Sequence, residues 1–254
     1  MKVFTVNIRS VILGLVAICL VLCIVIIAIS ISVAGAQNKK VLPIYRVGVE
    51  PADKRISVTF DNAWGADDIP DILASLKKYN AKATFFVLGT WVEKYPEIVK
   101  SIFDEGHEIA NHSYVHYHPA KLSDKQLTEE IVKCNEAIKS VTGKECNIYR
   151  APYGEYNNEV VTNAQNNGMF VIQWDVDSLD WRNEMTKQAI YDRVTKKVKA
   201  GSIILFHNDT KYTREVLPEI LEKLTSDGYT SVTVSNLIYK ENYSIDNNGQ
   251  QNKR

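Results

Sequence analysis

Short apolar runs alternate with longer amphipathic stretches over most of this 254-residue chain. The short runs are rich in β-branched and aromatic residues, which favours strands, and the longer stretches repeat apolar positions with helical spacing. The predicted strands are Ile56–Phe60, Thr84–Val87, Glu108–Asn111, Asn147–Arg150, Phe170–Asp175, Ser202–Leu205 and Ser231–Val234. The predicted helices are Ile69–Tyr79, Pro96–Glu105, Ser123–Thr142, Asn158–Asn167, Thr186–Lys199 and Val216–Asp227. This alternation predicts an α/β fold, a distorted, incomplete (β/α) barrel with about seven strands, with a doubly wound open sheet as the alternative.

The ends of these elements carry further signals. Ser123 and Asn158 are predicted to cap the N-termini of their helices. No glycine-rich phosphate loop follows the first strand, so the sequence does not predict nucleotide binding. Because barrel enzymes place their chemistry at the C-terminal ends of the strands, we expect functional residues there.

The first segment of the chain differs from the rest. Residues 11–34 form an uncharged apolar run, and a helix needs about 20 such residues to cross a bilayer. We therefore expect a transmembrane helix, with residues 1–36 as a membrane anchor; the alternative is a signal segment cleaved near Ala36. Residues 37–53 are predicted to form a linker and residues 54–240 a globular domain. Residues 241–254, rich in Asn, Gln and Lys, are predicted to be a disordered tail.

Composition narrows the function classes. With 45% hydrophobic and 24% charged residues, the chain can bury one sizeable core. Its 30 basic and 30 acidic side chains balance, so no overall field attracts nucleic acid or an acidic polymer. A neutral glycan suits this balance, no nucleic-acid partner is expected, and we expect a monomer.

Five short polar motifs each lie at the end of an apolar run. They cover residues 59–62, 112–116, 150–154, 177–181 and 205–208. Two histidines four residues apart are weak evidence of a metal site alone, but five such motifs in this order bring metal ligands, carboxylates, an arginine and a further histidine to one end of a barrel. Together they predict one metal-assisted hydrolytic site.

The order of these motifs resembles the polysaccharide deacetylase family, whose NodB-type domain removes acetyl groups from glycans. The resemblance covers about Lys54 to Ile238, and Trp64-Gly65 after the first motif is similar to the sporulation-associated peptidoglycan deacetylase branch. It implies a metal-dependent hydrolase that removes N-acetyl groups from a cell-wall glycan during sporulation. Such a substrate implies that the domain lies outside the cytoplasm, either membrane-anchored or secreted.

The resemblance assigns the metal ligands. His112 and His116 match the two histidines of the family's site, and the ion is expected to be zinc, with cobalt as an alternative. The family's third ligand is an aspartate, and in this chain that position is Asn62. An amide oxygen can coordinate a cation but carries no charge, so we predict weaker metal affinity or a changed ligand set.

The resemblance also assigns catalytic roles. Asp61 matches the general base and Arg150 the residue that orients it. Tyr153 matches the residue whose backbone N–H stabilises the oxyanion. His207 matches the general acid, and Asp180 the carboxylate that keeps this histidine charged.

Trp181 and Leu205 match the walls of the pocket for the acetyl methyl group, although large apolar residues serve equally well as core. Two other functions stay open at this point. Loss of the metal carboxylate at Asn62 would leave a membrane-anchored glycan-binding or structural protein with impaired catalysis. The same site could also hydrolyse an amide that is not part of a carbohydrate.

Overall fold

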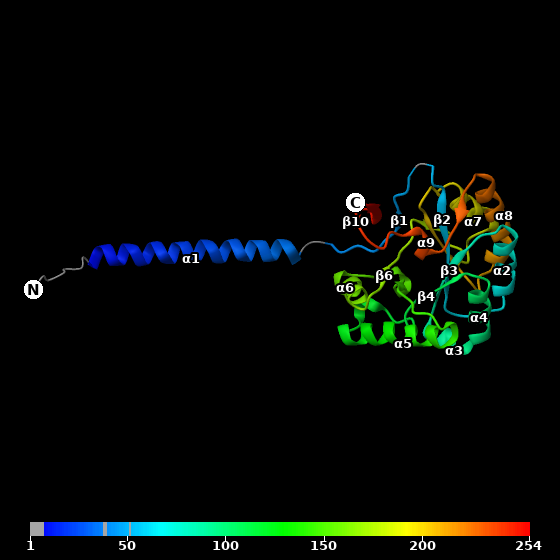
Figure 1. Ribbon diagram of the computed structural model, residues 1–254, viewed down its shortest axis with the longest axis horizontal. Coiled ribbons are helices and arrows are strands. Elements are labelled where there is room, and N and C mark those ends of the chain that lie inside the picture. The colour runs from blue at the N-terminus through cyan, green and yellow to red at the C-terminus, as the bar shows by residue number, and fades with distance from the viewer. Residues whose placement is uncertain (1–7, 38–39, 51) are drawn as a thin grey trace, which may run out of the picture. The chain divides into compact units, whose positions relative to one another are not determined.

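The computed structural model describes residues 8–37, 40–50 and 52–254, and it divides into two compact units. The first unit, within residues 1–40, contains helix α1 (Ile8–Gln37; Figure 1). The side chains of residues 12–27 are exposed. Among the described residues, no helix is long and apolar enough to cross a membrane. The predicted transmembrane helix is therefore not confirmed.

The second unit, Val41–Arg254, is built around a parallel sheet. The strands follow the order β6-β5-β4-β3-β2-β8-β7, and β9 also pairs with β2. The bounds of these strands are β2 (Arg55–Asn62), β3 (Ala83–Val87), β4 (Glu108–Asn111), β5 (Ile148–Tyr149), β6 (Phe170–Val171), β7 (Val176–Asp177), β8 (Ile203–His207) and β9 (Thr230–Ser231). The predicted α/β architecture, a distorted and incomplete barrel, is confirmed.

Helices cover the outside of this sheet (Figure 1). Their bounds are α2 (Ile69–Lys78), α3 (Gly89–Lys94), α4 (Pro96–Asp104), α5 (Asp124–Thr142), α6 (Asn158–Asn166), α7 (Lys187–Thr195), α8 (Thr213–Ser226) and α9 (Val234–Leu237), with short 3-10 turns at Pro119–Lys121 and Pro152–Gly154. Ser123 caps α5 with a capping box, as predicted. The predicted cap Asn158 is wrong, because Asn157 accepts the hydrogen bond from the N–H of Val160 while Asn158 accepts one from Val41.

Two predicted domain boundaries are wrong. The described residues of the predicted linker pack on the barrel: Ile44 bridges to Ile172, and β1 (Arg46–Val47) pairs with β11 (Gln250–Lys253). The predicted disordered tail forms β11 and β10 (Tyr243–Ile245), which are antiparallel. Backbone pairing and the fully buried Gln251 amide, which bonds to both the N–H and the C=O of Tyr239, replace the apolar burial that the tail lacks.

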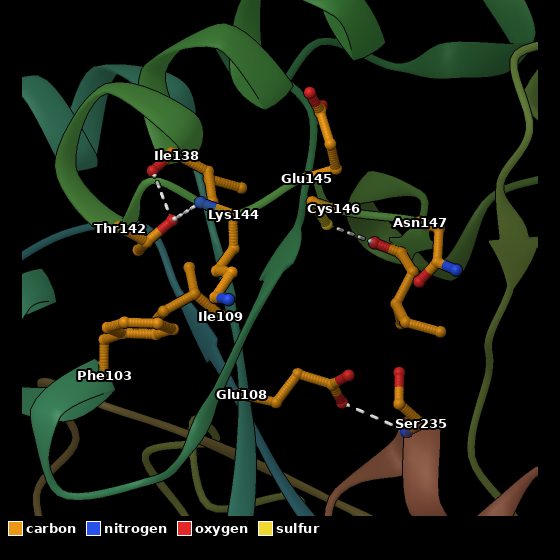
Figure 2. A pocket seen from close by; sticks show the side chains of 11 residues that line it. Phe103, Glu108, Ile109, Ile138, Thr142, Lys144, Glu145, Cys146, Asn147 and Ser235 are labelled. Atoms are coloured by element: carbon orange, nitrogen blue, oxygen red, sulfur yellow. Dashed lines mark hydrogen bonds between the residues drawn. The ribbon is translucent and has the colours of Figure 1, made fainter.

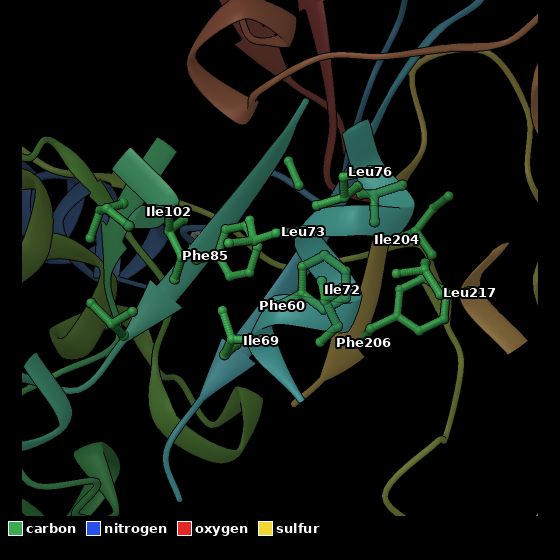
Figure 3. Packing of buried hydrophobic residues seen from close by; sticks show 14 of the residues in the cluster. Phe60, Ile69, Ile72, Leu73, Leu76, Phe85, Ile102, Ile204, Phe206 and Leu217 are labelled. Carbon is green, nitrogen blue, oxygen red and sulfur yellow. The ribbon is translucent and has the colours of Figure 1, made fainter. Parts of the chain in front are cut away.

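The main core lies between the sheet and the helices (Figure 3). The register of β2 and β8 within it determines which side chains face away from the core. Phe60 stacks between Phe85 and Phe206, with ring centroids 4.9 and 5.8 Å away, and the cluster packs against α2 and α8. Neighbours in register on parallel strands point to the same face, and successive residues alternate. Asp61 and His207, paired in register one residue further on, therefore share the opposite face.

Candidate active site

A cleft of about 670 Å³ opens at the C-terminal ends of the strands. Its lining includes eight residues that the sequence assigns to the site: Asp61, His112, His116, Tyr153, Asp180, Trp181, Leu205 and His207. The other two, Asn62 and Arg150, are fully buried and lie outside this lining. The structure thus gathers one set of residues from five separate strand ends.

Arg150 holds Asp61 in place. Its Nη1 lies 2.6 Å from Asp61 Oδ1 and also donates to Thr59 Oγ1, while Nη2 donates to the carbonyl of Gln173. The guanidinium carbon lies 3.9 Å from the centre of the Phe86 ring. This ion pair gives the buried Asp61 carboxylate the partner that a buried charge needs. The catalytic roles expected of the two residues stay predictions.

The same contacts decide the charge of Asp61. Burial alone would raise the pKa of this carboxyl, but the charge of Arg150, with smaller effects from His112 and His207, outweighs it and holds the pKa below its usual range. Asp61 is therefore ionised at neutral pH. A carboxylate with a lowered pKa is a weak base, so it can remove a proton only from water that is itself activated.

His112 and His116 present neutral imidazoles. His112 Nδ1 donates to the carbonyl of Arg150, because that oxygen can only accept, and this leaves Nε2 with a free lone pair 3.6 Å from Asp61 Oδ2. The two imidazole ring centres are 5.1 Å apart. Burial lowers the pKa of His112 and lowers that of His116 to about 4, so both rings are in the form that binds metal at neutral pH.

Glu130 on α5 fixes the loop between these histidines. Its Oε2 accepts hydrogen bonds from Ser113 Oγ and from the backbone N–H groups of Tyr114 and Val115, at 2.6 to 3.0 Å. Ser113 and His116 both have positive φ, 76° and 67°, and such backbone needs support from its surroundings. Sequence reasoning missed Glu130, because nothing in the sequence distinguishes it from the other acidic residues of the predicted Ser123–Thr142 helix, such as its neighbour Glu129.

Asn62 decides whether a metal fits. It ends β2 beside Asp61, and neither its Oδ1 nor its Nδ2 has a hydrogen-bond partner among the described residues, although both are buried. A buried amide without partners is costly, and its oxygen is suited to a cation. No group of three or more His, Cys, Asp or Glu that could hold a metal occurs in the described part of the chain. The donor types that the sequence assigns, two imidazoles and one uncharged amide, are chemically suited to a divalent ion, and Asn62 lies just outside the cleft lining.

His207 and Asp180 form a second charged pair in the cleft. His207 Nδ1 lies 2.8 Å from Asp180 Oδ1, and the other carboxylate oxygen accepts from the His207 backbone N–H and from Thr213 Oγ1. Burial would lower the pKa of His207, but the hydrogen bond and charge of Asp180 outweigh it, so the pKa is raised. The structure therefore supports a protonated His207. Thr213, at the start of α8, gave no signal in the sequence.

The remaining predicted residues form the cleft's surface. Tyr153 has φ of 59°, and its ring stacks on His118 at 4.2 Å and meets His116 edge-on at 4.4 Å. Leu205 is buried, so it forms the floor, whereas Trp181 is exposed at the rim. The oxyanion role expected of the Tyr153 backbone N–H stays a prediction.

A smaller pocket lies at the opposite ends of β4 and β5 (Figure 2). Glu108 already accepts from Thr84 and from the Ser235 N–H there, and the Cys146 thiol donates to the carbonyl of Ile148. Burial raises the pKa of Cys146 to about 12, so it is not a reactive thiolate. The reactive groups are in the larger cleft.

Comparisons with known proteins agree with this site. The sequence profile described as polysaccharide deacetylase matches residues 48–172. The chain is 39% identical over 189 residues to peptidoglycan-N-acetylmuramic acid deacetylase PdaC of Bacillus subtilis, covering 74% of this chain and 40% of that protein. It is 35% identical over 191 residues to a peptidoglycan-N-acetylglucosamine deacetylase of Bacillus cereus, covering 73% of this chain and 89% of that protein.

One matching solved structure is that of a protein described as a pseudoenzyme. The chain matches a CE4 family pseudoenzyme from Bacillus anthracis with a TM-score of 0.73 and 32% identity, covering 84% of this chain and 73% of that one. A mutant of that pseudoenzyme, described as having restored enzymatic activity, matches with a TM-score of 0.72 and 36% identity. The family therefore includes members with and without activity.

This chain belongs to the polysaccharide deacetylase family, CE4, which confirms the resemblance seen in the motifs. The two relatives described above are named peptidoglycan deacetylases. The chain spans less than half the length of the first of them, covering 40% of PdaC.

Proposed function

We propose that this protein removes N-acetyl groups from peptidoglycan or another N-acetylglucosamine polymer. The observation that carries the proposal is the meeting of two oppositely tuned pairs in one cleft, Asp61 with Arg150 and Asp180 with His207. Two titratable groups whose environments push their pKa values apart are the usual sign of a base and an acid. The names of the relatives support peptidoglycan as the substrate.

The proton steps follow from these contacts. Asp61, ionised and fixed by Arg150, takes a proton from the attacking water at Oδ2, the oxygen that Arg150 does not bind. His207, held protonated by Asp180, gives a proton from Nε2 to the amine as it leaves the tetrahedral carbon. The Tyr153 backbone N–H stabilises the oxyanion.

His112, His116 and Asn62 are the residues that would hold a divalent ion, for which we propose zinc first and cobalt second. When bound, such an ion lowers the pKa of coordinated water to about 7 and polarises the acetyl carbonyl. Asp61, although a weak base, could then remove a proton from this water. Because the third donor is uncharged, we expect lower metal affinity than with a carboxylate at this position.

The test is acetate release. The purified protein is incubated with peptidoglycan or N-acetylglucosamine oligomers in the presence of zinc or cobalt, and metal content is measured in the same sample. Acetate should form, and His207→Ala and Asp61→Asn should abolish it while leaving bound metal largely unchanged. No acetate from protein shown to contain metal would refute the proposal.

A second function is favoured by Asn62 together with the Bacillus anthracis pseudoenzyme. On this alternative, the protein binds glycan without hydrolysing it, because the uncharged donor no longer retains the ion. Asn62→Asp separates the two functions. If the parent lacks bound metal and activity and the variant gains both, the binding function holds; if the parent turns over and His112→Ala abolishes turnover, the enzyme function holds.

We propose further that the domain works outside the cytoplasm, where its polymer lies, and that it acts in sporulation. The apolar N-terminal segment, retained or cleaved near Ala36, would direct it there. N-terminal sequencing of the mature protein and its recovery from intact, protease-treated cells would test the location. Unchanged spores after deletion of the gene would contradict the role in sporulation.

A further inference from the structure

Trp64 is an exposed tryptophan at the cleft. Its side chain is 69% exposed, more than any other large hydrophobic residue described in the second unit, and it lines the cleft. An indole held in water at the edge of a site indicates a binding surface. Trp64 lies outside the five motifs and has no part in the chemistry derived above.

The backbone beside Trp64 is held rigidly by the loop that follows His207. The N–H of Gly65 donates to Asp209 Oδ2 at 3.0 Å, and the N–H of Asp209 donates to Asp68 Oδ2 at 2.8 Å. The carbonyl of Gly65 accepts from Trp91 Nε1 and from Asn208 Nδ2. The backbone N–H and the backbone C=O of Gly65 are thus both hydrogen-bonded, and we call this set of contacts the Gly65 clamp.

Gly65 cannot be replaced without opening this clamp. A Cβ at this position would lie 2.8 to 2.9 Å from the carboxylate atoms of Asp209. The close approach of the two loops therefore requires glycine, and this explains why a glycine follows the tryptophan. Rigid neighbours lower the entropy that Trp64 would lose on binding a ligand.

Trp64 begins a row of rings along the cleft. Its ring centre lies 6.2 Å from that of His116, which meets Tyr153 at 4.4 Å, and Tyr153 stacks on His118. His116 is one of the proposed metal ligands, so Trp64 lies beside the proposed reacting centre rather than in it. Pyranose rings present flat C–H faces that pack on aromatic rings, and a polymer supplies the next ring.

We propose that Trp64 is the binding platform for the pyranose next to the one that reacts, and that Asp209 is a positioning residue that acts through it. This rests on the proposed glycan function and deepens it, because the site then takes a chain of at least two N-acetylated sugars. A monosaccharide would not reach the platform.

Calorimetric titration of the full-length protein tests this in the presence of a chelator, which prevents turnover. N-acetylglucosamine and its tetramer are the two ligands. Trp64→Ala should weaken tetramer binding about tenfold and leave monomer binding unchanged, and Trp64→Tyr should restore most of the loss. Tyr117→Ala, which removes a 54% exposed aromatic outside the cleft lining, should bind both ligands like the parent.

The clamp is tested with Asp209. Asp209→Ala should weaken tetramer binding, whereas Asp209→Asn keeps an oxygen that accepts from the Gly65 N–H and should restore it. Because Asp209 acts through Trp64, the double variant with Trp64→Ala should bind no more weakly than Trp64→Ala alone. If the double variant weakens tetramer binding by the product of the two single-variant factors, Asp209 does not act through Trp64 and the positioning role is overturned.

Three results would overturn the platform itself: no tetramer binding by the parent, no effect of Trp64→Ala, or equal losses for monomer and tetramer. Because the readout is binding, it is separate from acetate release. If Trp64→Ala weakens tetramer binding in a protein that releases no acetate, the platform stands and the deacetylase proposal fails. If the parent releases acetate and Trp64→Ala binds normally, the platform alone fails.

Discussion

Two substitutions of Asn62 should change stability in opposite directions without metal, and should gain unequal amounts of stability with it. The buried amide has no partner for Oδ1 or Nδ2 among the described residues, and an unsatisfied buried polar group costs about 1–3 kcal/mol. Asn62→Leu, close in volume, should therefore stabilise the protein by about that amount in the presence of a chelator. Asn62→Asp should destabilise it by about 3 kcal/mol, because it adds a buried charge next to Asp61 while Arg150 neutralises only one.

Zinc should shrink the gap between Asn62→Asp and the other two proteins. A ligand present at about 100 times its Kd stabilises the folded state by about 2.7 kcal/mol. Asn62→Asp should recover most of its loss in zinc, the parent should gain less at the same concentration, and Asn62→Leu should gain least. For a domain of this size about 1 kcal/mol corresponds to a Tm change of about 2–4 °C, so the differences are measurable.

The assay is thermal and denaturant unfolding of the full-length variants in chelator and across a zinc titration, with bound metal measured in parallel. Lys77→Ala, an exposed change on α2, is the control for handling and should respond like the parent. The reasoning is refuted if Asn62→Asp is as stable as the parent in chelator. It is also refuted if Asn62→Leu keeps the full zinc response, since Asn62 would then not be a ligand.

Three further outcomes are expected. Asp180→Asn should lower the pKa of His207, because it removes the charge that raises it; a histidine NMR titration shows this directly, and in an active protein the alkaline limb of kcat/KM should move to lower pH. In the parent, protonated His207 contributes stability that is full below the unfolded-state pKa and is lost as pH rises through the raised folded-state pKa. This contribution should disappear in Asp180→Asn. A stability difference between variant and parent that does not change with pH would contradict this. Glu130→Ala should weaken zinc binding by about 10-fold or more by releasing the His112 loop, whereas the exposed neighbour Glu129→Ala should not. Gln251→Ala should lower the free energy of unfolding by about 2 kcal/mol, because it leaves the N–H and C=O of Tyr239 without partners; a change below about 0.5 kcal/mol in denaturant unfolding would contradict it.

Strands with a clear apolar pattern were predictable, and contacts made by the backbone were not. The predicted strand Glu108–Asn111 is β4 to the residue, and the helix predicted from Ile69 starts there as α2. The predicted strand Phe170–Asp175 is wrong in its extent, because β6 ends at Val171 and a separate strand, β7, begins at Val176. The predicted strand at Ser231–Val234 is also wrong, since β9 ends at Ser231 and Val234 begins α9.

The site shows the same division. Asp61, His112, Arg150 and His207 follow apolar runs in recognisable motifs, and the shared strand ends explain why they meet. Glu130 and Thr213 act from helices through bonds to loops, and Asp209 acts through the backbone of Gly65. Such partners are set by which loops come together in space, and no local pattern in the sequence encodes that.

The pairing of β1 with β11 has a consequence for the order of folding. Arg46 aligns with Gln250, so two segments more than two hundred residues apart must meet before this small sheet exists. Closing so long a loop is entropically costly and slow. A nascent chain therefore cannot complete this small sheet until β11 has been synthesised, so this closure comes after synthesis of the rest of the second unit.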